Sequence, residues 1–203
     1  MDETTKMVPE STKRVMLKDV CELQKGFDFI NEELNSENVF FNSFPILYSH
    51  NMNGRNVDLE DLKYVDFNKK FEKYKISEND ILISLTGDNI GMPVLFTHTN
   101  FLVSDHLALI RIKKDTILPK FLFYCMQTYQ FEDFINSATT GITNHMLDLS
   151  KFLTCEIPLP TVKVQQSIID SLESKEVDII HFERNIAHKE EEIEELLNLN
   201  LNV

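Results

Sequence analysis

Three short polar segments of the chain carry side chains that suit contact with nucleic acid. They span residues 49–56 (SHNMNGRN), 103–106 (VSDH) and 139–145 (TTGITNH). Asparagine can form paired hydrogen bonds with adenine and arginine with guanine, and serine and threonine hydroxyls suit phosphate oxygens. The same residue types also form ordinary turns, so both interpretations stay open for each segment. Under the binding interpretation, the DNA-contacting residues are Asn51, Asn53, Arg55, Ser104, His106, Thr143, Asn144 and His145.

Lysines interleave with aromatic residues in a fourth segment, residues 67–75 (FNKKFEKYK). Such a segment can contact phosphates, and it can equally form a solvated amphipathic turn.

Signatures of catalysis are absent from the sequence. It contains no GxxxxGK[ST], GxGxxG, HExxH or GxSxG motif, and no Asn-Pro-Pro-aromatic motif of an adenine methyltransferase. Asp80 and Asp88 flank a strand-like run, but strand-end turns explain them more simply than acid–base chemistry does. His181 and His188 lie on one face of a helical segment, where a solvated surface explains them more simply than a metal pair does. We expect no enzyme activity, no metal and no cofactor.

The composition narrows the class of protein further. The chain has 203 residues, 33 acidic and 20 basic side chains, and a formal charge of −13, which excludes a histone-like protein that binds DNA by bulk positive charge. Cys21, Cys125 and Cys155 are far apart, so a disulfide framework or zinc site is not expected. The first residues lack a secretory signal, and no apolar run approaches the roughly 20 residues needed to span a membrane. We expect a cytoplasmic protein.

The positions of strand and helix signals predict an α/β domain followed by a long helix. We expect a disordered leader over residues 1–13 and a compact domain over residues 14–160. Pro119 opens a helical pattern that continues to Ala138, since proline suits a first turn. The expected strands span residues 44–48, 80–86, 92–96, 107–112 and 152–157, with the second and third forming a hairpin.

Residues 161–203 contain no glycine or proline and follow a heptad pattern. A single helix of 35–40 residues would be roughly 55–60 Å long, too long to be covered by the preceding domain. Lys175, Lys189 and Asn200 interrupt the apolar stripe, and residues 165–203 carry ten acidic and three basic side chains. The pattern predicts a coiled coil with another helix. Its apolar stripe consists of Ile168, Leu172, Ile179, Phe182, Ile186, Ile193 and Leu196.

From Val15 onward, the order of motifs resembles half of a specificity subunit from type I restriction-modification systems. The resemblance rests on VMLKDVCELQKGF, ISENDILISLTGDNIG, LPKFLFYCMQT with TTGITNHMLDLSKFLTCEIPLP, and VQQSIIDSL. Val164 departs from the acidic residue that commonly precedes Gln165. A complete subunit also has two target recognition domains and two spacer helices, whereas this chain has one of each.

The resemblance implies a noncatalytic protein that reads one half of a bipartite site in double-stranded DNA. Its spacer helix would pair antiparallel with a second one, methyltransferase subunits would dock along it, and a translocating nuclease subunit would complete the enzyme. Because a lone stripe would be exposed to water, we also expect a second copy of the chain to pair with it. A fragment whose missing half supplies that helix remains an alternative, as does an acidic coiled-coil adaptor or anti-restriction decoy that binds no DNA.

Overall fold

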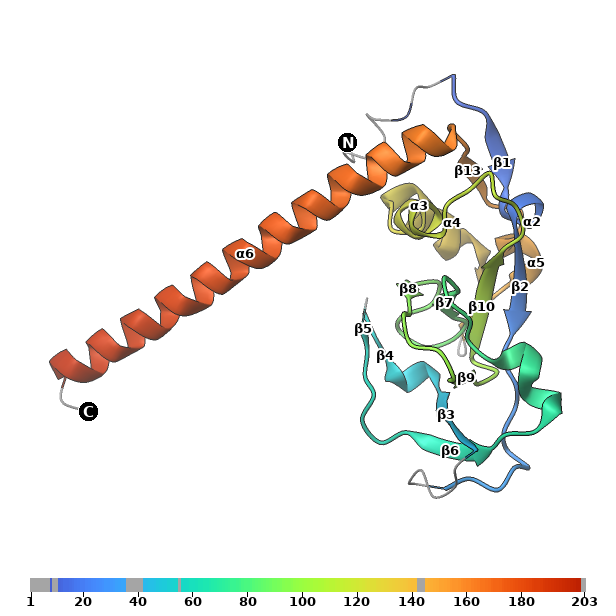
Figure 1. Ribbon diagram of the computed structural model, residues 1–203, viewed down its shortest axis with the longest axis horizontal. Helices are drawn as coiled ribbons and strands as arrows, with labels where there is room; N and C mark the ends of the chain where they lie inside the picture. Colours follow the sequence, from blue (N-terminus) through green and yellow to red (C-terminus); the bar gives the residue numbers. More distant parts are fainter. Residues whose placement is uncertain (1–7, 9–10, 36–41, 55, 142–144, 202–203) are drawn as a thin grey trace.

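The computed structural model describes residues 8, 11–35, 42–54, 56–141 and 145–201, with side chains up to Leu196. Within these residues, an α/β domain carries one long helix, α6 (Val162–Leu201), whose far end projects away from the domain (Figure 1). Both parts of the predicted fold class are confirmed. No helix among the described residues is long and apolar enough to cross a membrane.

A four-stranded antiparallel sheet divides the core into two layers. Its strand order is β2 (Cys21–Lys25), β10 (Leu107–Ile112), β7 (Ile81–Ser84) and β8 (Pro93–Leu95). Side chains alternate between the faces of a strand, so Ala108 and Ile110 face one hydrophobic cluster while Leu107 and Leu109 face another. All four are fully buried, so β10 lies at the centre of the domain.

Helices cover one face of this sheet and smaller strands lie beside the other (Figure 1). The helical layer contains α2 (Leu17–Val20), α3 (Pro119–Cys125), α4 (Tyr129–Ala138), α5 (Leu149–Phe152) and the start of α6. The pair of β1 (Arg14–Met16) and β13 (Glu156–Pro158) joins the two ends of the domain.

The second layer contains β6 (Lys63–Asp66), β3 (Ser43–Leu47) and β9 (Leu102–Val103), with β9 parallel to β3. Two short hairpins lie outside these sheets. They consist of β4 (Met52–Asn53) with β5 (Asn56–Val57) and β11 (Thr139–Thr140) with β12 (Met146–Leu147); the 3-10 helices are η1 (Ser49–Asn51) and η2 (Lys69–Tyr74).

Three sequence predictions need correction. The helical pattern over residues 119–138 is two helices, because Thr128 caps a new one by accepting a hydrogen bond from the Phe131 amide. Phe152 ends α5 instead of starting the last strand, because Asp148 caps that helix through the amides of Ser150 and Lys151. Val8, within the predicted leader, packs against the core; residues 1–7 and 9–10 lie outside the described residues.

A fully buried glutamine fixes the start of α6 to the domain. The Gln165 side-chain oxygen accepts a hydrogen bond from the Leu118 amide at 2.8 Å, and its nitrogen donates to the carbonyls of Thr116 and Pro160. Farther along, Lys120 pairs with Glu173, and the Tyr124 hydroxyl donates to Glu176 at 3.0 Å. The first four turns of α6 therefore belong to the domain.

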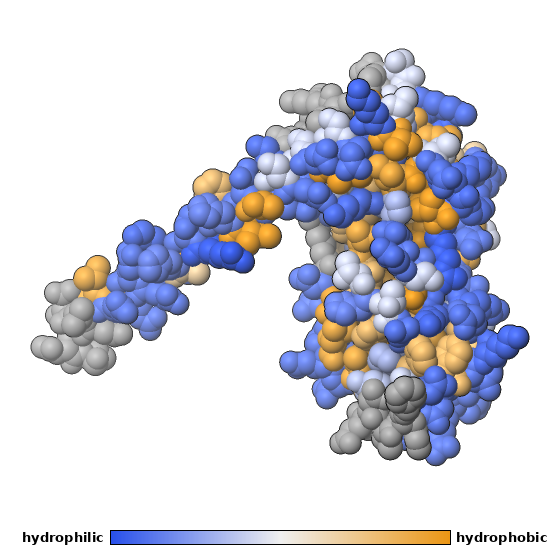
Figure 2. Space-filling view, viewed as in Figure 1, coloured by the Kyte–Doolittle hydropathy of each residue, from blue (hydrophilic) through white to orange (hydrophobic). Residues whose placement is uncertain are grey.

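Two residues of the predicted stripe are covered by the chain itself, which corrects the expectation that the whole stripe is exposed. Ile168 is 1% exposed, and Leu172 packs against the helical layer. Farther out, Ile179, Phe182 and Ile186 are each more than half exposed, as the apolar side chains along the projecting helix in Figure 2 show. The same stripe thus serves the domain at one end and faces solvent at the other.

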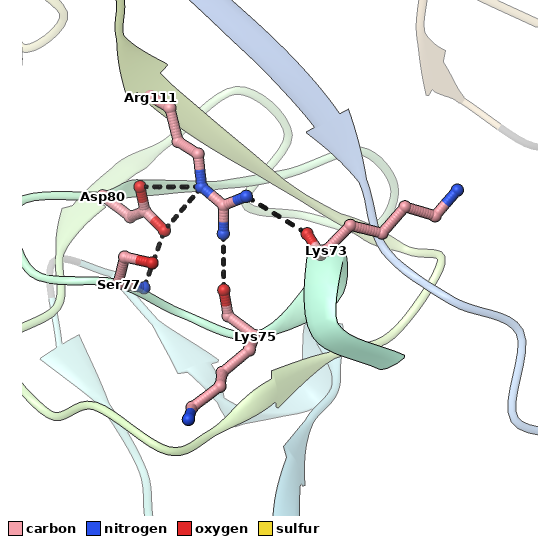
Figure 3. Close-up of polar contacts among 5 residues, drawn as sticks. All are labelled: Lys73, Lys75, Ser77, Asp80 and Arg111. Carbon is pink, nitrogen blue, oxygen red and sulfur yellow. Dashed lines mark hydrogen bonds and ion pairs between the residues drawn. The ribbon is translucent and has the colours of Figure 1, made fainter. Parts of the chain in front are cut away.

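A buried ion pair ties the second layer to the central sheet (Figure 3). The Arg111 Nε lies 3.1 Å from both carboxylate oxygens of Asp80, and its terminal nitrogens donate to the carbonyls of Lys73 and Lys75. Burial raises the pKa of Asp80, while the Ser77 amide and Arg111 oppose that shift. Asp80 therefore has a structural role, whereas Asp88 lies in an exposed turn.

Candidate nucleic-acid interface

The loop between β7 and β8, residues 86–91 (TGDNIG), forms a hub that the polar segments share. Positive φ angles at Gly87 and Gly91 make its tight turns possible. The Gly91 amide donates to the Ser84 carbonyl at 2.8 Å, and a Cβ at Gly91 would lie only 2.6 Å from Ile135. Glycine is therefore required there both by the backbone conformation and by the packing of α4.

Two of the three predicted polar segments contact this hub loop, and the third directly precedes a residue that does. The Asn89 amide group donates to the Met52 carbonyl at 2.8 Å, which connects residues 49–56. The Thr86 hydroxyl lies 3.3 Å from His106 Nδ1, which connects residues 103–106. Thr86 also forms a β-bridge with Met146, which connects the hub to the strand that follows residues 139–145. Segments separated by about 90 residues in sequence therefore meet at one edge of the domain.

The predicted DNA-contacting residues are divided between this edge and the interior. Asn53, His106 and His145 are exposed, and the His106 side chain retains 52% of its surface. Arg55, Thr143 and Asn144 lie outside the described residues, and their contact with DNA stays a prediction.

Asn51 and Ser104 are buried, at 2% and 1% exposure. The Asn51 side-chain oxygen accepts a hydrogen bond from the Tyr48 amide and so caps the η1 turn. The Ser104 hydroxyl has no hydrogen-bond partner among the described residues. Neither side chain reaches the surface that Asn53 and His106 share, so we leave both out of the interface.

Sequence reasoning missed the hub loop as a candidate interface. Thr86, Asp88 and Asn89 present a hydroxyl, a carboxylate and an amide between the predicted segments. Met92 and Met146 add exposed apolar surface beside them, at 38% and 49% exposure. Such a mixture can form hydrogen bonds with base edges and apolar contacts with a thymine methyl group. The TGDNIG sequence predicted only a turn, because the proximity of the other loops depends on the tertiary fold.

Positive charge gathers in residues 63–75, which include η2. Lys70 lies 4.9 Å above the Phe71 ring and 5.8 Å from the Phe27 ring, and it pairs with Glu32 at 2.7 Å. Phe27 forms a β-bridge with Ser104, the second residue of the VSDH segment. Residues 63–75 hold five lysines and two acidic residues, a local charge of +3 in a chain of −13. Lysine side chains suit contacts with phosphate groups.

Among the described residues, no group of three His, Cys, Asp or Glu side chains is placed to hold a metal ion. Burial raises the pKa of Cys21 to about 12 and that of Cys155 to about 11. A reactive cysteine has a lowered pKa and an accessible thiol, so these two cysteines are structural.

A comparison with known proteins identifies the family to which the chain belongs. The sequence pattern described as the type I restriction modification DNA specificity domain matches residues 9–195. The chain belongs to this family. The expected resemblance is therefore confirmed. The chain is also similar to the type I restriction enzyme EcoBI specificity subunit of Escherichia coli, at 18% identity over 175 residues, which cover 85% of this chain and 36% of that protein.

Solved structures of the family share the fold of this chain. The HsdS subunit from Thermoanaerobacter tengcongensis matches 93% of the chain with a TM-score of 0.70 at 18% identity, and the alignment covers 43% of that subunit. The type I restriction-modification S subunit from M. genitalium matches 95% with a TM-score of 0.59 at 18% identity, covering 48% of that subunit. This specificity-domain chain thus spans less than half the length of the relatives it matches.

Proposed function

We propose that this chain reads one half of a bipartite site in double-stranded DNA, and that it does so with the hub loop and its neighbours. The observation that supports the proposal is that Asn89 and Thr86 contact two of the predicted polar segments, and that Thr86 also pairs with Met146, next to the third. The readout set is Asn53, Thr86, Asn89, His106 and His145, together with the predicted Arg55, Thr143 and Asn144. Lysines of η2 contact the flanking phosphates.

The acidic side chains of the chain lower its expected nonspecific affinity for DNA. Acidic side chains reduce the phosphate neutralisation that supplies most nonspecific affinity, and Asp88 and Asp105 lie at the edge itself. We propose that a methyltransferase subunit supplies further phosphate contacts, and that it performs the chemistry that this chain does not. A translocating nuclease subunit would join the complete assembly.

Helix α6 has surface for more than one partner. Its stripe of Ile179, Phe182, Ile186 and Ile193 suits a second copy of the chain. Val177 and Ile180, at 65% and 47% exposure, lie on other faces of the helix and suit the methyltransferase subunit. Two copies related by a two-fold axis would read identical half-sites, so we expect the DNA site to be an interrupted palindrome.

The second candidate is an acidic coiled-coil protein that binds other proteins and no DNA. Its support is the charge of −13 together with the exposed apolar side chains of α6. Selection from a randomised duplex library, with the chain alone and with a methyltransferase subunit, separates the two candidates. Our proposal predicts enrichment of one bipartite motif when both proteins are present. Recovery of unenriched sequence under both conditions, from a complex that assembles normally, would favour the second candidate.

A further inference from the structure

One asparagine of the proposed DNA-reading edge stands directly before a glycine. Asn53 precedes Gly54, and no other asparagine of the sequence is followed by glycine. The pair lies at the tip of the hairpin formed by β4 and β5, where Gly54 is the first of the two connecting residues. Its φ of 60° suits a two-residue hairpin turn. The hairpin tip therefore places an asparagine side chain next to the backbone amide of a glycine.

The surroundings of this pair leave both groups free to move. Asn53 is exposed, and its side chain forms no hydrogen bond with any residue that the structure describes. A Cβ on Gly54 would have no heavy atom within 4 Å. The ladder of the hairpin pairs only Met52 with Val57 and Asn53 with Asn56, and so short a ladder opens locally at low cost. The Asn53 side chain can therefore turn toward the Gly54 amide.

We propose that Asn53 is a site of spontaneous deamidation, and that the reaction alters DNA reading at this position. In the first step hydroxide removes the proton of the Gly54 amide, and the nitrogen attacks Cγ of Asn53. A bond forms between that nitrogen and Cγ, while the bond between Cγ and Nδ2 breaks. The side-chain nitrogen takes a proton from water, which regenerates hydroxide, and leaves as ammonia. The product is a cyclic succinimide.

Water then opens the succinimide at either of its two carbonyl groups. Opening at Cγ leaves an aspartate at position 53 with a normal backbone. Opening at the backbone carbonyl carbon leaves an isoaspartate, in which the chain continues through Cγ. Both products carry a carboxylate in place of the amide. The net reaction consumes one water and releases one ammonia, so the chain needs no enzyme, metal or oxidant for it.

The residue that follows each asparagine decides which one reacts. Glycine has no side chain, so its amide nitrogen approaches the neighbouring Cγ with little steric hindrance. Asn56, across the hairpin, precedes the β-branched Val57, whose side chain hinders this approach. Asn51 is buried, and its side-chain oxygen accepts a hydrogen bond from the Tyr48 amide. Among these three asparagines, Asn53 should therefore react first.

Deamidation changes the groups that position 53 offers to DNA, a consequence that rests on the proposed function. An asparagine amide pairs with adenine through one donor and one acceptor, whereas a carboxylate only accepts, as it does from the cytosine amino group. The new negative charge also repels phosphates, at an edge where Asp88 and Asp105 already lie. A deamidated chain should therefore lose its preference at one base position.

Peptide mapping of the full chain tests the chemistry without DNA. Samples are incubated at neutral and at mildly alkaline pH, digested, and analysed by mass spectrometry for isoaspartate and aspartate. Conversion of Asn53 should be faster at alkaline pH, because hydroxide removes the proton of the attacking amide. Asn51 and Asn56 of the same chain are internal references and should keep their amides. Conversion of Asn53 no faster than that of Asn56, or conversion that yields no isoaspartate, would overturn the proposal.

Two substitutions connect the chemistry with DNA reading. Asn53→Asp reproduces one product directly, whereas Asn53→Gln keeps an amide whose longer side chain closes a ring less readily. Fresh and incubated samples of the chain and of Asn53→Gln, together with fresh Asn53→Asp, are each used with a methyltransferase subunit to select sites from a duplex library. The incubated chain and Asn53→Asp should lose the same base preference, while incubation should not change the motif that Asn53→Gln selects.

The outcomes separate this inference from the proposed function. A deamidated chain that selects the same motif as the fresh chain would overturn the effect on DNA reading. Absence of any motif from the fresh chain would instead count against the proposed function, and peptide mapping would still decide whether Asn53 is the deamidation site.

Discussion

The docked and projecting halves of α6 follow the same heptad pattern but have different surroundings. In the docked half, Gln165 and Ile168 are almost completely buried beneath the domain. In the projecting half, Phe182 and Ile186 expose about 60% of their surface. Periodicity therefore identifies an apolar stripe without saying which part is covered by its own chain. Four experiments test this difference between the two parts of the helix.

Thiol reactivity should show the largest difference between the domain and the projecting helix. Burial raises the pKa of Cys21 from 9.0 to about 12, so its thiolate fraction at pH 8 falls about a thousandfold, and the thiolate is the reactive form. At a protein concentration low enough to keep the chain monomeric, an Ile186→Cys thiol on the projecting half should react with iodoacetamide at an ordinary rate. Peptide mapping after timed alkylation checks this. Equal labelling of Cys21 and the introduced cysteine would contradict the burial.

The second contrast compares one isoleucine from each half. Ile168→Ala should lower the free energy of unfolding by about 2–5 kcal/mol, because it creates a cavity in the core. Ile186→Ala should change the unfolding of the monomeric domain by less than about 0.5 kcal/mol, as surface substitutions do. Urea denaturation at low protein concentration measures both. Similar losses in the two variants would mean that both halves are packed within one chain.

The third contrast uses adjacent glutamines. Gln165→Leu removes the acceptor for the Leu118 amide and the donor to two carbonyls, so it should cost about 1–3 kcal/mol of stability. Gln166 is exposed, and its side chain donates a hydrogen bond to Asp170 on the same helix, so Gln166→Leu is a matched control with little expected effect. Indistinguishable denaturation midpoints would show that Gln165 does not anchor the helix.

The smallest effect should come from the last contact before α6 leaves the domain. Tyr124→Phe removes the hydroxyl that donates to Glu176, and a hydrogen bond of this kind contributes about 1 kcal/mol. Tyr129→Phe changes a side chain that is 71% exposed and serves as the control. Hydrogen exchange of the amides near residue 176 should increase only in the first variant. Unchanged exchange would place the end of the docked half before Glu176.

Sequence reasoning located the main elements but not their contacts. The run over 107–112 matches β10, and the absence of glycine and proline after residue 160 predicted α6 closely. The burial of Ser104 and the covering of Ile168 depend on which segments pack together, so local pattern could not supply them. The Asp148 cap is different, since an aspartate before Leu-Ser-Lys is a recognisable helix start. That signal was available, and the strand prediction over residues 152–157 overlooked it.

The hub loop shows most clearly what the sequence alone could not predict. Asn89 and Thr86 contact Met52, His106 and Met146, which are far apart in the sequence. Each segment alone has the composition of a turn, and only the fold shows that they share one edge. The sequence thus indicated which polar side chains these segments carry, whereas their common location comes from the fold.

Mapping of methylated sites tests the account most directly. The chain and its His106→Ala variant are each assembled with a methyltransferase subunit, and methylated bases are located across a genome. His181→Ala, which changes an exposed histidine of α6, is the matched control. We predict that His106→Ala relaxes the preference at one base position, with a loss of about 1–3 kcal/mol in discrimination, while His181→Ala keeps the original motif. Identical motifs from all three proteins, or relaxation caused by His181→Ala alone, would contradict DNA reading by the hub loop edge.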